Sequence, residues 1–230
     1  MKAKIKKLIK KYRKTEPIEQ DIVITDNGHN NTIDIEDTSC FKASQIVING
    51  NNNQVNIAKN RVIRGLSVVI NGNNKSFIID GGVRNIVNLK FESIRGSNQE
   101  VRIGKNFSCG GLQIRMNDGD ERCFIGDDCL FSWDIKIRTS DGHSIVDLDT
   151  NKAVNLPEDV LIGDRVWCCE EVSFLKGSRI ANDCVIGTRA LITKSFTNSN
   201  VVIAGSPAKI VKHNIGWHRD MPYLHNEKQY

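Results

Sequence analysis

The chain has no long apolar run, few aromatic residues and few prolines. Its apolar stretches fall well short of the roughly 18 residues that a transmembrane helix needs. The basic N-terminus lacks the apolar segment of a secretory signal peptide. Aromatic residues are 6% of the 230 residues, although large cores normally depend on them. These shortages argue against a membrane-spanning or secreted protein, and they favour a core of many thin layers of Ile, Val and Leu.

The sequence also lacks cysteines at the spacing of a zinc site, and outside residues 1–14 it has no excess of basic residues. The seven cysteines are odd in number and match no zinc pattern, so we expect reduced thiols, a cytoplasmic location and no metal. The net charge of +5 comes from residues 1–14, which hold eight basic and no acidic side chains. The remaining 24 basic and 27 acidic residues predict no nucleic-acid partner.

Asparagine is abundant, and it marks an internal repeat. The chain contains 24 Asn, and Asn/Gly-rich turns follow apolar residues spaced by 22 or 24, at Ile24, Ile48, Ile70, Ile94 and Met116. A second marker, an apolar–x–apolar triplet, keeps nearly the same period and ends at Ile35, Ile57, Ile79, Ile103 and Ile125. Gly and Asn suit such turns because both tolerate left-handed backbone.

The C-terminal half shortens to a strict period of six. Apolar residues recur without a gap at Ile162, Cys168, Phe174, Ile180, Ile186 and Ile192, and small or β-branched residues lie four positions after the first five. Helices repeat apolar residues at three and four, and simple strands repeat them at two. A period of six therefore predicts short strands on the three sides of a triangular prism. The longer upstream coils add an Asn-rich turn at one corner.

The two ends differ from this repeat and define the expected organisation. Residues 1–15 place apolar residues at helical spacing among lysines, which predicts a basic amphipathic helix. That helix suits either peripheral membrane association through residues 1–14 or a cap on the open solenoid. The solenoid domain is expected at 16–213 and a C-terminal cap or subunit contact at 214–230.

A long loop interrupts the coil over residues 138–158, where earlier coils place their Asn turn. Long loops on rigid scaffolds commonly carry function. The run from Ser140 through Asp-Gly-His143-Ser, followed by Ile162-Gly-Asp-Arg-Val-Trp167, Ala204-Gly205-Ser-Pro207-Ala-Lys209 and Asn214-Ile-Gly-Trp217, resembles the hexapeptide-repeat acyltransferases. The resemblance is to the bacterial capsule, polysialic-acid and lipopolysaccharide O-acetyltransferases, and it implies an all-β, left-handed parallel β-helix.

This resemblance implies transfer of acetyl from acetyl-CoA to a sugar hydroxyl, with His143 as general base. A hydroxyl is a weak nucleophile, and imidazole has a suitable pKa for taking its proton. Asp134, Asp141, Asp147 or a backbone carbonyl could orient His143. The resemblance places Trp167 beside the base, where its indole could stabilise the oxyanion or simply pack. Cys168, Cys169 and Cys184 are not expected to act as nucleophiles; Cys168 and Cys184 occupy inward positions of the repeat.

The cofactor contacts are also carried by the resemblance. They fall on Trp167, Glu170, Thr188, Thr193, Lys194, Lys209 and Lys212, with the lysines complementing phosphates. Bulk at Cys169, Glu170 and Arg189, where the family has smaller residues, could crowd the cofactor groove.

The resemblance further implies a homotrimer with a saccharide acceptor, at the inner face of the membrane if residues 1–14 bind there. The alternatives are an N-acetyltransferase acting on a nucleotide amino sugar and a non-catalytic carbohydrate-binding solenoid. Trp133 could stack on a sugar or pack against the protein.

Overall fold

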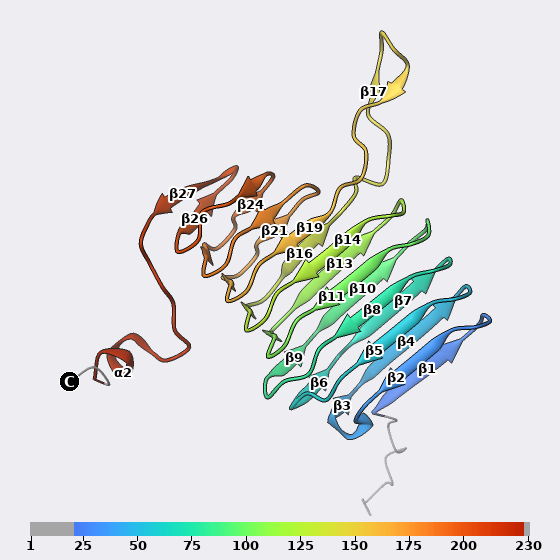
Figure 1. The fold of residues 1–230 in the computed structure, drawn as a ribbon, viewed down its shortest axis with the longest axis horizontal. Helices are drawn as coiled ribbons and strands as arrows, with labels where there is room; N and C mark the ends of the chain where they lie inside the picture. The colour runs from blue at the N-terminus through green and yellow to red at the C-terminus, as the bar shows by residue number, and fades with distance from the viewer. Residues whose placement is uncertain (1–20, 228–230) are drawn as a thin grey trace, which may run out of the picture.

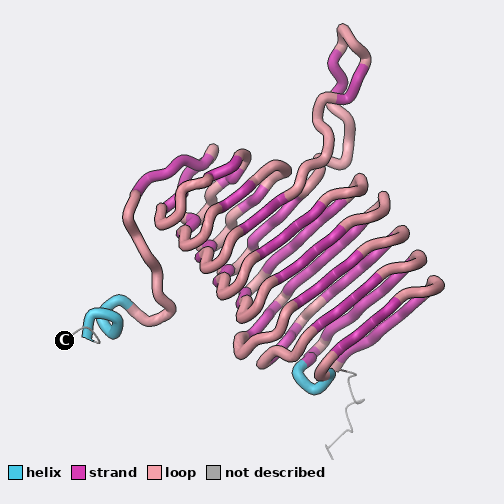
Figure 2. Tube along the Cα trace, viewed as in Figure 1, coloured by secondary structure: helices cyan, strands magenta, loops and turns pink. Residues whose placement is uncertain are grey.

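The computed structural model describes residues 21–227, so the expected helix of residues 1–15 and its membrane role lie outside the described residues. Within that range the chain winds through three long sheets in turn, forming a prism (Figures 1 and 2). The predicted left-handed parallel β-helix is confirmed. In the described part, no helix combines the length and apolar character needed to cross a bilayer.

The three sides of the prism are named sheets A, B and C. Sheet A contains β1 (Ile22–Asp26), β4 (Ser44–Asn49), β7 (Ser67–Asn71), β10 (Leu89–Ser93), β13 (Leu112–Met116), β16 (Ile135–Arg138), β21 (Ser173–Phe174) and β24 (Leu191–Ile192). Sheet B contains β2 (Thr32–Ile35), β5 (Gln54–Ile57), β8 (Ser76–Ile79), β11 (Glu100–Ile103), β14 (Arg122–Ile125), β19 (Val160–Ile162), β22 (Arg179–Ile180) and β25 (Ser195–Phe196). Sheet C contains β3 (Phe41–Lys42), β6 (Val62–Arg64), β9 (Asn85–Val87), β12 (Ser108–Cys109), β15 (Leu130–Phe131), β20 (Trp167–Cys168), β23 (Val185–Ile186), β26 (Val202–Gly205) and β27 (Ala208–Lys212).

The interior of the prism is filled by the residues that the repeat singled out. The hexapeptide positions from Ile162 to Ile192 are all buried, as are the small residues four positions later. The core is mostly Ile, Val and Leu, as expected, but it also holds stacked aromatics. The rings of Phe77 and Phe91 stack at 5.1 Å between centroids. Each coil is thus a thin layer that lies on the next, which explains how a chain with few aromatics builds a long core.

The A–B corner, where the chain passes from sheet A to sheet B, carries the Asn-rich turns and a column of buried polar side chains. The Asn31 and Asn53 side chains each accept a backbone N–H from the next coil, at 2.8 and 3.0 Å. Lys75, Gln99 and Glu121 continue the column along the next coils, and these three and Asn53 are buried while Asn31 is half-buried. At Gly50 a Cβ atom would lie 1.9 Å from the Gly72 carbonyl oxygen, so only glycine allows these turns to stack.

The two ends of the described solenoid differ in structure. A single 3-10 turn, η1 (Thr38–Cys40), leads into β3 in the first coil. At the other end β27 folds back antiparallel on β26 and forms the edge of sheet C. The following segment leaves this hairpin and ends in α2 (Pro222–Glu227) (Figure 1).

Candidate active site

The loop that carries His143 stands at the A–B corner, as the interrupted repeat predicts. It leaves β16 in sheet A and returns to β19 in sheet B, projecting away from the prism (Figures 1 and 2). Its outer part is a small antiparallel hairpin of β17 (Val146–Asp147) and β18 (Lys152–Ala153). The hairpin region exposes Leu148, Leu156, Val154 and Ile145 at 94%, 68%, 62% and 61%.

The root of this loop is held by a compact polar network. Asn155 Nδ2 donates to Asp141 Oδ2 and to the His143 carbonyl oxygen, both at 2.8 Å, and its Oδ1 accepts the Ile145 N–H at 2.7 Å. Lys176 Nζ lies 2.6 Å from Asp141 Oδ2. The Lys176 ammonium, with Asn155, lowers the pKa of Asp141. The backbone of His143 is thereby fixed to the scaffold while the residue remains exposed.

The flank of the root adds two further anchors. The Arg95 guanidinium donates to the Gly142 carbonyl oxygen, and the Ser140 hydroxyl donates to Asp118. The Ser140 oxygen also accepts the Gly142 N–H at 3.0 Å. A loop attached at this many points can present one side chain in a constant direction, which acid–base catalysis requires.

None of the three carboxylates that could orient His143 is positioned to do so within one chain: two have other hydrogen-bond partners, and the third lies at another corner. Asp141 is engaged by Lys176 and Asn155. Asp147 Oδ1 caps the hairpin turn by accepting the Thr150 N–H at 2.7 Å and its hydroxyl at 2.8 Å. Asp134 lies at a different corner, between β15 and β16. Across residues 21–227, none of the three forms a hydrogen bond with the His143 imidazole.

Trp167 lies on another side of the prism from His143. It belongs to β20 in sheet C, which is opposite the A–B corner. The Trp217 ring lies 6.2 Å away, and the Trp217 indole donates to the Arg165 carbonyl oxygen at 2.5 Å. Trp167 Nε1 is buried and has no hydrogen-bond partner in the described part of the chain. One chain therefore does not bring the predicted base and the predicted indole donor together.

The predicted cofactor residues form two groups. Glu170 and Thr188 lie at the C–A corner, where the chain passes from sheet C to sheet A, close in sequence to the sheet C strands β20 and β23. Lys209 and Lys212 lie on β27 at the edge of sheet C. Thr193 and Lys194 instead follow β24 at the A–B corner, on the side of the His143 loop. All six are exposed, which leaves the three ammonium groups available to phosphates.

Two of the three residues suspected of crowding, Arg189 and Cys169, have side-chain partners at the C–A corner. Arg189 Nε pairs with Glu171 Oε2 at 2.8 Å, which raises the pKa of Arg189 and lowers that of Glu171. Both residues have left-handed backbone, with φ of 60° and 59°. Cys169 is half-buried and hydrogen-bonds the Thr188 side chain.

The cysteine thiols are poorly placed for nucleophilic chemistry. Cys168 is fully buried, and burial raises its pKa well above its ordinary value. Burial also raises the pKa of Cys169 and of Cys184. Because the thiolate is the reactive form, the raised pKa values argue against these three thiols as nucleophiles.

Sequence reasoning missed the anchoring roles of Asn155, Lys176 and Arg95. Neither the repeat nor the family motifs tell which groups the side chains of Asn155 and Lys176 contact. The contact of Arg95 with Gly142 joins residues 47 positions apart across two corner turns. A repeat of 22 residues could have pointed to it, because it stacks the two turns.

Comparison with known proteins agrees with this fold. No family model matches the chain. A polysialic acid O-acetyltransferase from Neisseria meningitidis is 37% identical over 198 residues, covering 86% of this chain and 90% of that protein. One from Escherichia coli O1:K1 is 38% identical over 95 residues, and the match spans 31% of that protein. The crystal structure of the polysialic acid O-acetyltransferase OatWY superposes with a TM-score of 0.78 and 33% identity, covering 89% of this chain and 99% of that one.

The three-sided parallel solenoid, together with the OatWY superposition and the meningococcal relative, places the chain in the class of left-handed β-helix acyltransferases. The chain belongs to the hexapeptide-repeat O-acetyltransferase family that includes the polysialic acid enzymes.

Proposed function

We propose that the chain transfers the acetyl group of acetyl-CoA to a sugar hydroxyl of a bacterial surface polysaccharide, such as capsule, polysialic acid or lipopolysaccharide. The observation that carries this proposal is the meningococcal relative, a polysialic acid O-acetyltransferase that this chain matches over 90% of its length. The anchored loop that presents His143 adds support from the structure.

The reaction needs one acyl transfer and two proton transfers, one to His143 and one from it. A nitrogen of the His143 imidazole takes the proton of the sugar hydroxyl as its oxygen attacks the thioester carbonyl carbon. The carbon–sulfur bond then breaks, and the imidazolium returns the proton to the departing sulfur. The products are the O-acetyl ester and the thiol of coenzyme A, so no residue of the protein is acylated.

Exposed lysines at the A–B corner and at the edge of sheet C support acetyl-CoA as the donor. Lys194, Lys209 and Lys212 present exposed ammonium groups that suit the phosphates of coenzyme A. The Trp167 indole N–H is a donor without a partner among residues 21–227 and could serve the developing oxyanion.

The separation of His143 from Trp167 supports a homotrimer with its sites between subunits. In this arrangement the loop of one subunit meets sheet C of its neighbour. The apolar side chains exposed around the hairpin, Leu148 above all, would then be covered rather than left in water. Mixing His143→Ala and Trp167→Ala subunits tests this, because shared sites restore part of the activity and sites within one subunit restore none.

The function is tested by thiol release from acetyl-CoA with a panel of acceptors. The panel contains acidic polysaccharides, including sialic-acid polymers, neutral polysaccharides and nucleotide amino sugars. We expect release that depends on a polysaccharide and falls about 10²-fold or more in His143→Ala, the scale of a lost general base. The matched control is His29→Ala, an exposed histidine at the same corner of the first coil. Release with amino sugars alone would favour N-acetylation, and no release would favour a binding solenoid.

A further inference from the structure

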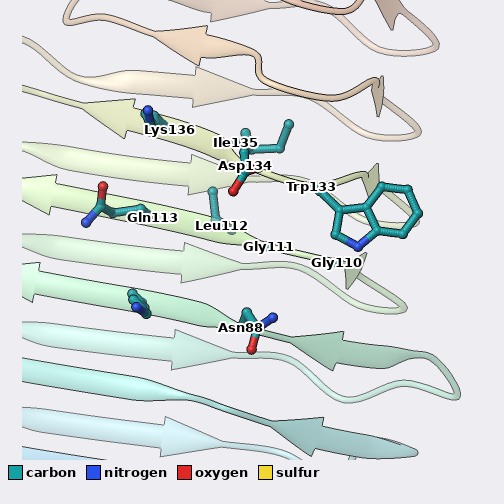
Figure 3. A pocket seen from close by; sticks show the side chains of 10 residues that line it. Asn88, Gly110, Gly111, Leu112, Gln113, Trp133, Asp134, Ile135 and Lys136 are labelled. Atoms are coloured by element: carbon teal, nitrogen blue, oxygen red, sulfur yellow. The ribbon is translucent and has the colours of Figure 1, made fainter.

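An exposed tryptophan lies on the C–A corner, one coil from the predicted cofactor residues. Trp133 stands between β15 and β16 with 60% of its surface exposed. Its indole lies over Gly110 of the preceding coil (Figure 3). A Cβ atom at Gly110 would lie 2.6 Å from Trp133 Nε1 and 2.8 Å from Cδ1. Gly110 has no left-handed backbone, so the close approach of the indole, and not the turn, requires glycine here.

The backbone that carries this indole is held by the coils on both sides. The Trp133 carbonyl oxygen accepts the Glu171 N–H of the next coil at 2.9 Å. The Gly110 N–H of the coil below donates to the Ser132 carbonyl oxygen at 3.0 Å. A tryptophan that only packed into a core would be buried. This one is an exposed ring on a hydrogen-bonded backbone, lying close to Gly110, and such an exposed ring can act as a binding platform.

Polar side chains line the hollow beside this ring. Lys90, Gln113 and Lys136 are register partners on β10, β13 and β16 of sheet A, so they form a row with about 4.8 Å between neighbours. Asn88 and the carboxylate of Asp134 line the other side. The hollow measures about 480 Å³, within the range of about 300–1,000 Å³ typical of small-molecule sites.

The charges around the hollow favour an anion. Lys90 and Lys136 are exposed, and within residues 21–227 neither forms an ion pair. The acidic residues near the two lysines are Asp134 in the hollow, Glu92 two residues beyond Lys90 on β10, which is paired with Arg115, and Glu171 in the coil above, whose pKa Lys136 helps to lower. Glu171 is already paired with Arg189. The two lysines can therefore face a carboxylate of a ligand that lies on the ring.

We propose that the hollow beside Trp133 is an acceptor subsite for one acidic sugar unit of the polysaccharide. The apolar face of the sugar ring stacks on the indole, its carboxylate faces Lys90 and Lys136, and Asn88 and Gln113 bind hydroxyls. The inference rests on the proposed acetyl transfer and adds where the acceptor chain lies. The same corner continues through Glu170 to Thr188, so a polymer lying along it reaches the predicted acetyl-CoA groove.

Binding is measured first, without acetyl-CoA, by calorimetry with oligomers of an acidic sugar and of a neutral sugar. We expect Trp133→Ala to weaken binding of the acidic oligomer by about tenfold or more, and Trp133→Phe to restore part of it. Lys136→Gln should weaken binding and reduce its dependence on salt, because it removes an exposed charge. Lys105→Gln, an exposed lysine at another corner, should change neither. Equal binding of acidic and neutral oligomers, or wild-type binding by Trp133→Ala, would overturn the subsite.

A kinetic measurement separates this subsite from the proposed function. In the thiol-release assay we expect Trp133→Ala to raise KM for the polymer with little change in kcat, because the indole binds acceptor without touching the reacting atoms. An unchanged KM in an active enzyme overturns the subsite and leaves the acetyl transfer standing. Acidic-oligomer binding that depends on Trp133 without any transfer overturns the function instead. Gly110→Ala, which displaces the indole, should mimic Trp133→Ala in both assays.

Discussion

The buried ammonium of Lys75 provides a quantitative test of how the A–B corner is held together. Its Nζ lies 2.6 Å from the Asn71 carbonyl oxygen, 3.1 Å from that of Arg95 and 2.9 Å from Gln99 Oε1. It also donates to the Ser93 hydroxyl. Burial lowers its pKa from the ordinary 10.5 to about 8, although Glu121 opposes the shift.

The substitution Lys75→Met sets two opposing effects against each other. Loss of the donor leaves the Asn71 and Arg95 carbonyl groups unsatisfied, at a cost of about 1–3 kcal/mol each. The substitution also removes a buried charge, whose lowered pKa corresponds to about 3 kcal/mol. At about pH 7 the lost hydrogen bonds slightly outweigh the relief, and we expect the variant to be less stable by about 1 kcal/mol.

The pH dependence decides whether this reasoning is right. Between about pH 8 and 10.5 the folded protein has released the Lys75 proton while the unfolded chain still holds it. Wild-type stability therefore gains from this residue as the pH rises through that window. Lys75→Met has no such gain, so its deficit should widen by up to about 3 kcal/mol.

Urea unfolding at fixed protein concentration, at about pH 7 and about pH 10, measures this difference, and groups common to both proteins cancel. Lys75→Asn extends the Asn31–Asn53 column and should be more stable than Lys75→Met at both values. A deficit that stays constant or narrows as the pH rises would refute the account of this corner.

Two further substitutions test the site. Asn155→Ala removes three hydrogen bonds at the loop root, so kcat should fall by about tenfold or more while the urea midpoint hardly moves; an unchanged kcat would show that the anchor is dispensable. Arg189→Gly removes an exposed ion pair but relieves a left-handed backbone, so we expect little change in stability. It should also leave KM for acetyl-CoA unchanged, because the Arg189 guanidinium is paired with Glu171. A severalfold lower KM in the variant would instead show that Arg189 crowds the cofactor.

The fold could be read from the sequence because a prism requires one inward residue per side in every coil. The apolar residues at Ile162, Cys168 and Phe174 recur at that interval, and the structure buries all of them. The position of the His143 loop followed from the same rule, since the segment interrupts the repeat where the earlier coils turn. Local pattern and global fold agree here at every level.

The site was less predictable because its contacts join residues on different coils. The inserted loop hides how far around the prism the chain has travelled between His143 and Trp167, and the two residues lie on different sides. The contact of the Trp133 indole with Gly110 is likewise a contact between stacked coils. In the sequence Gly110 looks like any turn glycine, and only the structure shows that its backbone is ordinary and that the indole requires it. Lys75 lies at the repeat position that Asn31 and Asn53 occupy in the two preceding coils. Its hydrogen-bond partners lie 4 to 24 residues away, so the repeat does not predict them.

The most direct test of the central claim is the nature of the bond that the enzyme forms. The purified protein is incubated with acetyl-CoA and an acidic polysaccharide, and the product is followed by NMR before and after mild base. The account predicts an acetyl signal on a sugar oxygen that mild base removes, because esters are labile where amides are not. The signal should be absent with His143→Ala. An acetyl group that survives base, or equal yield from the variant, would contradict O-acetyl transfer with His143 as the base.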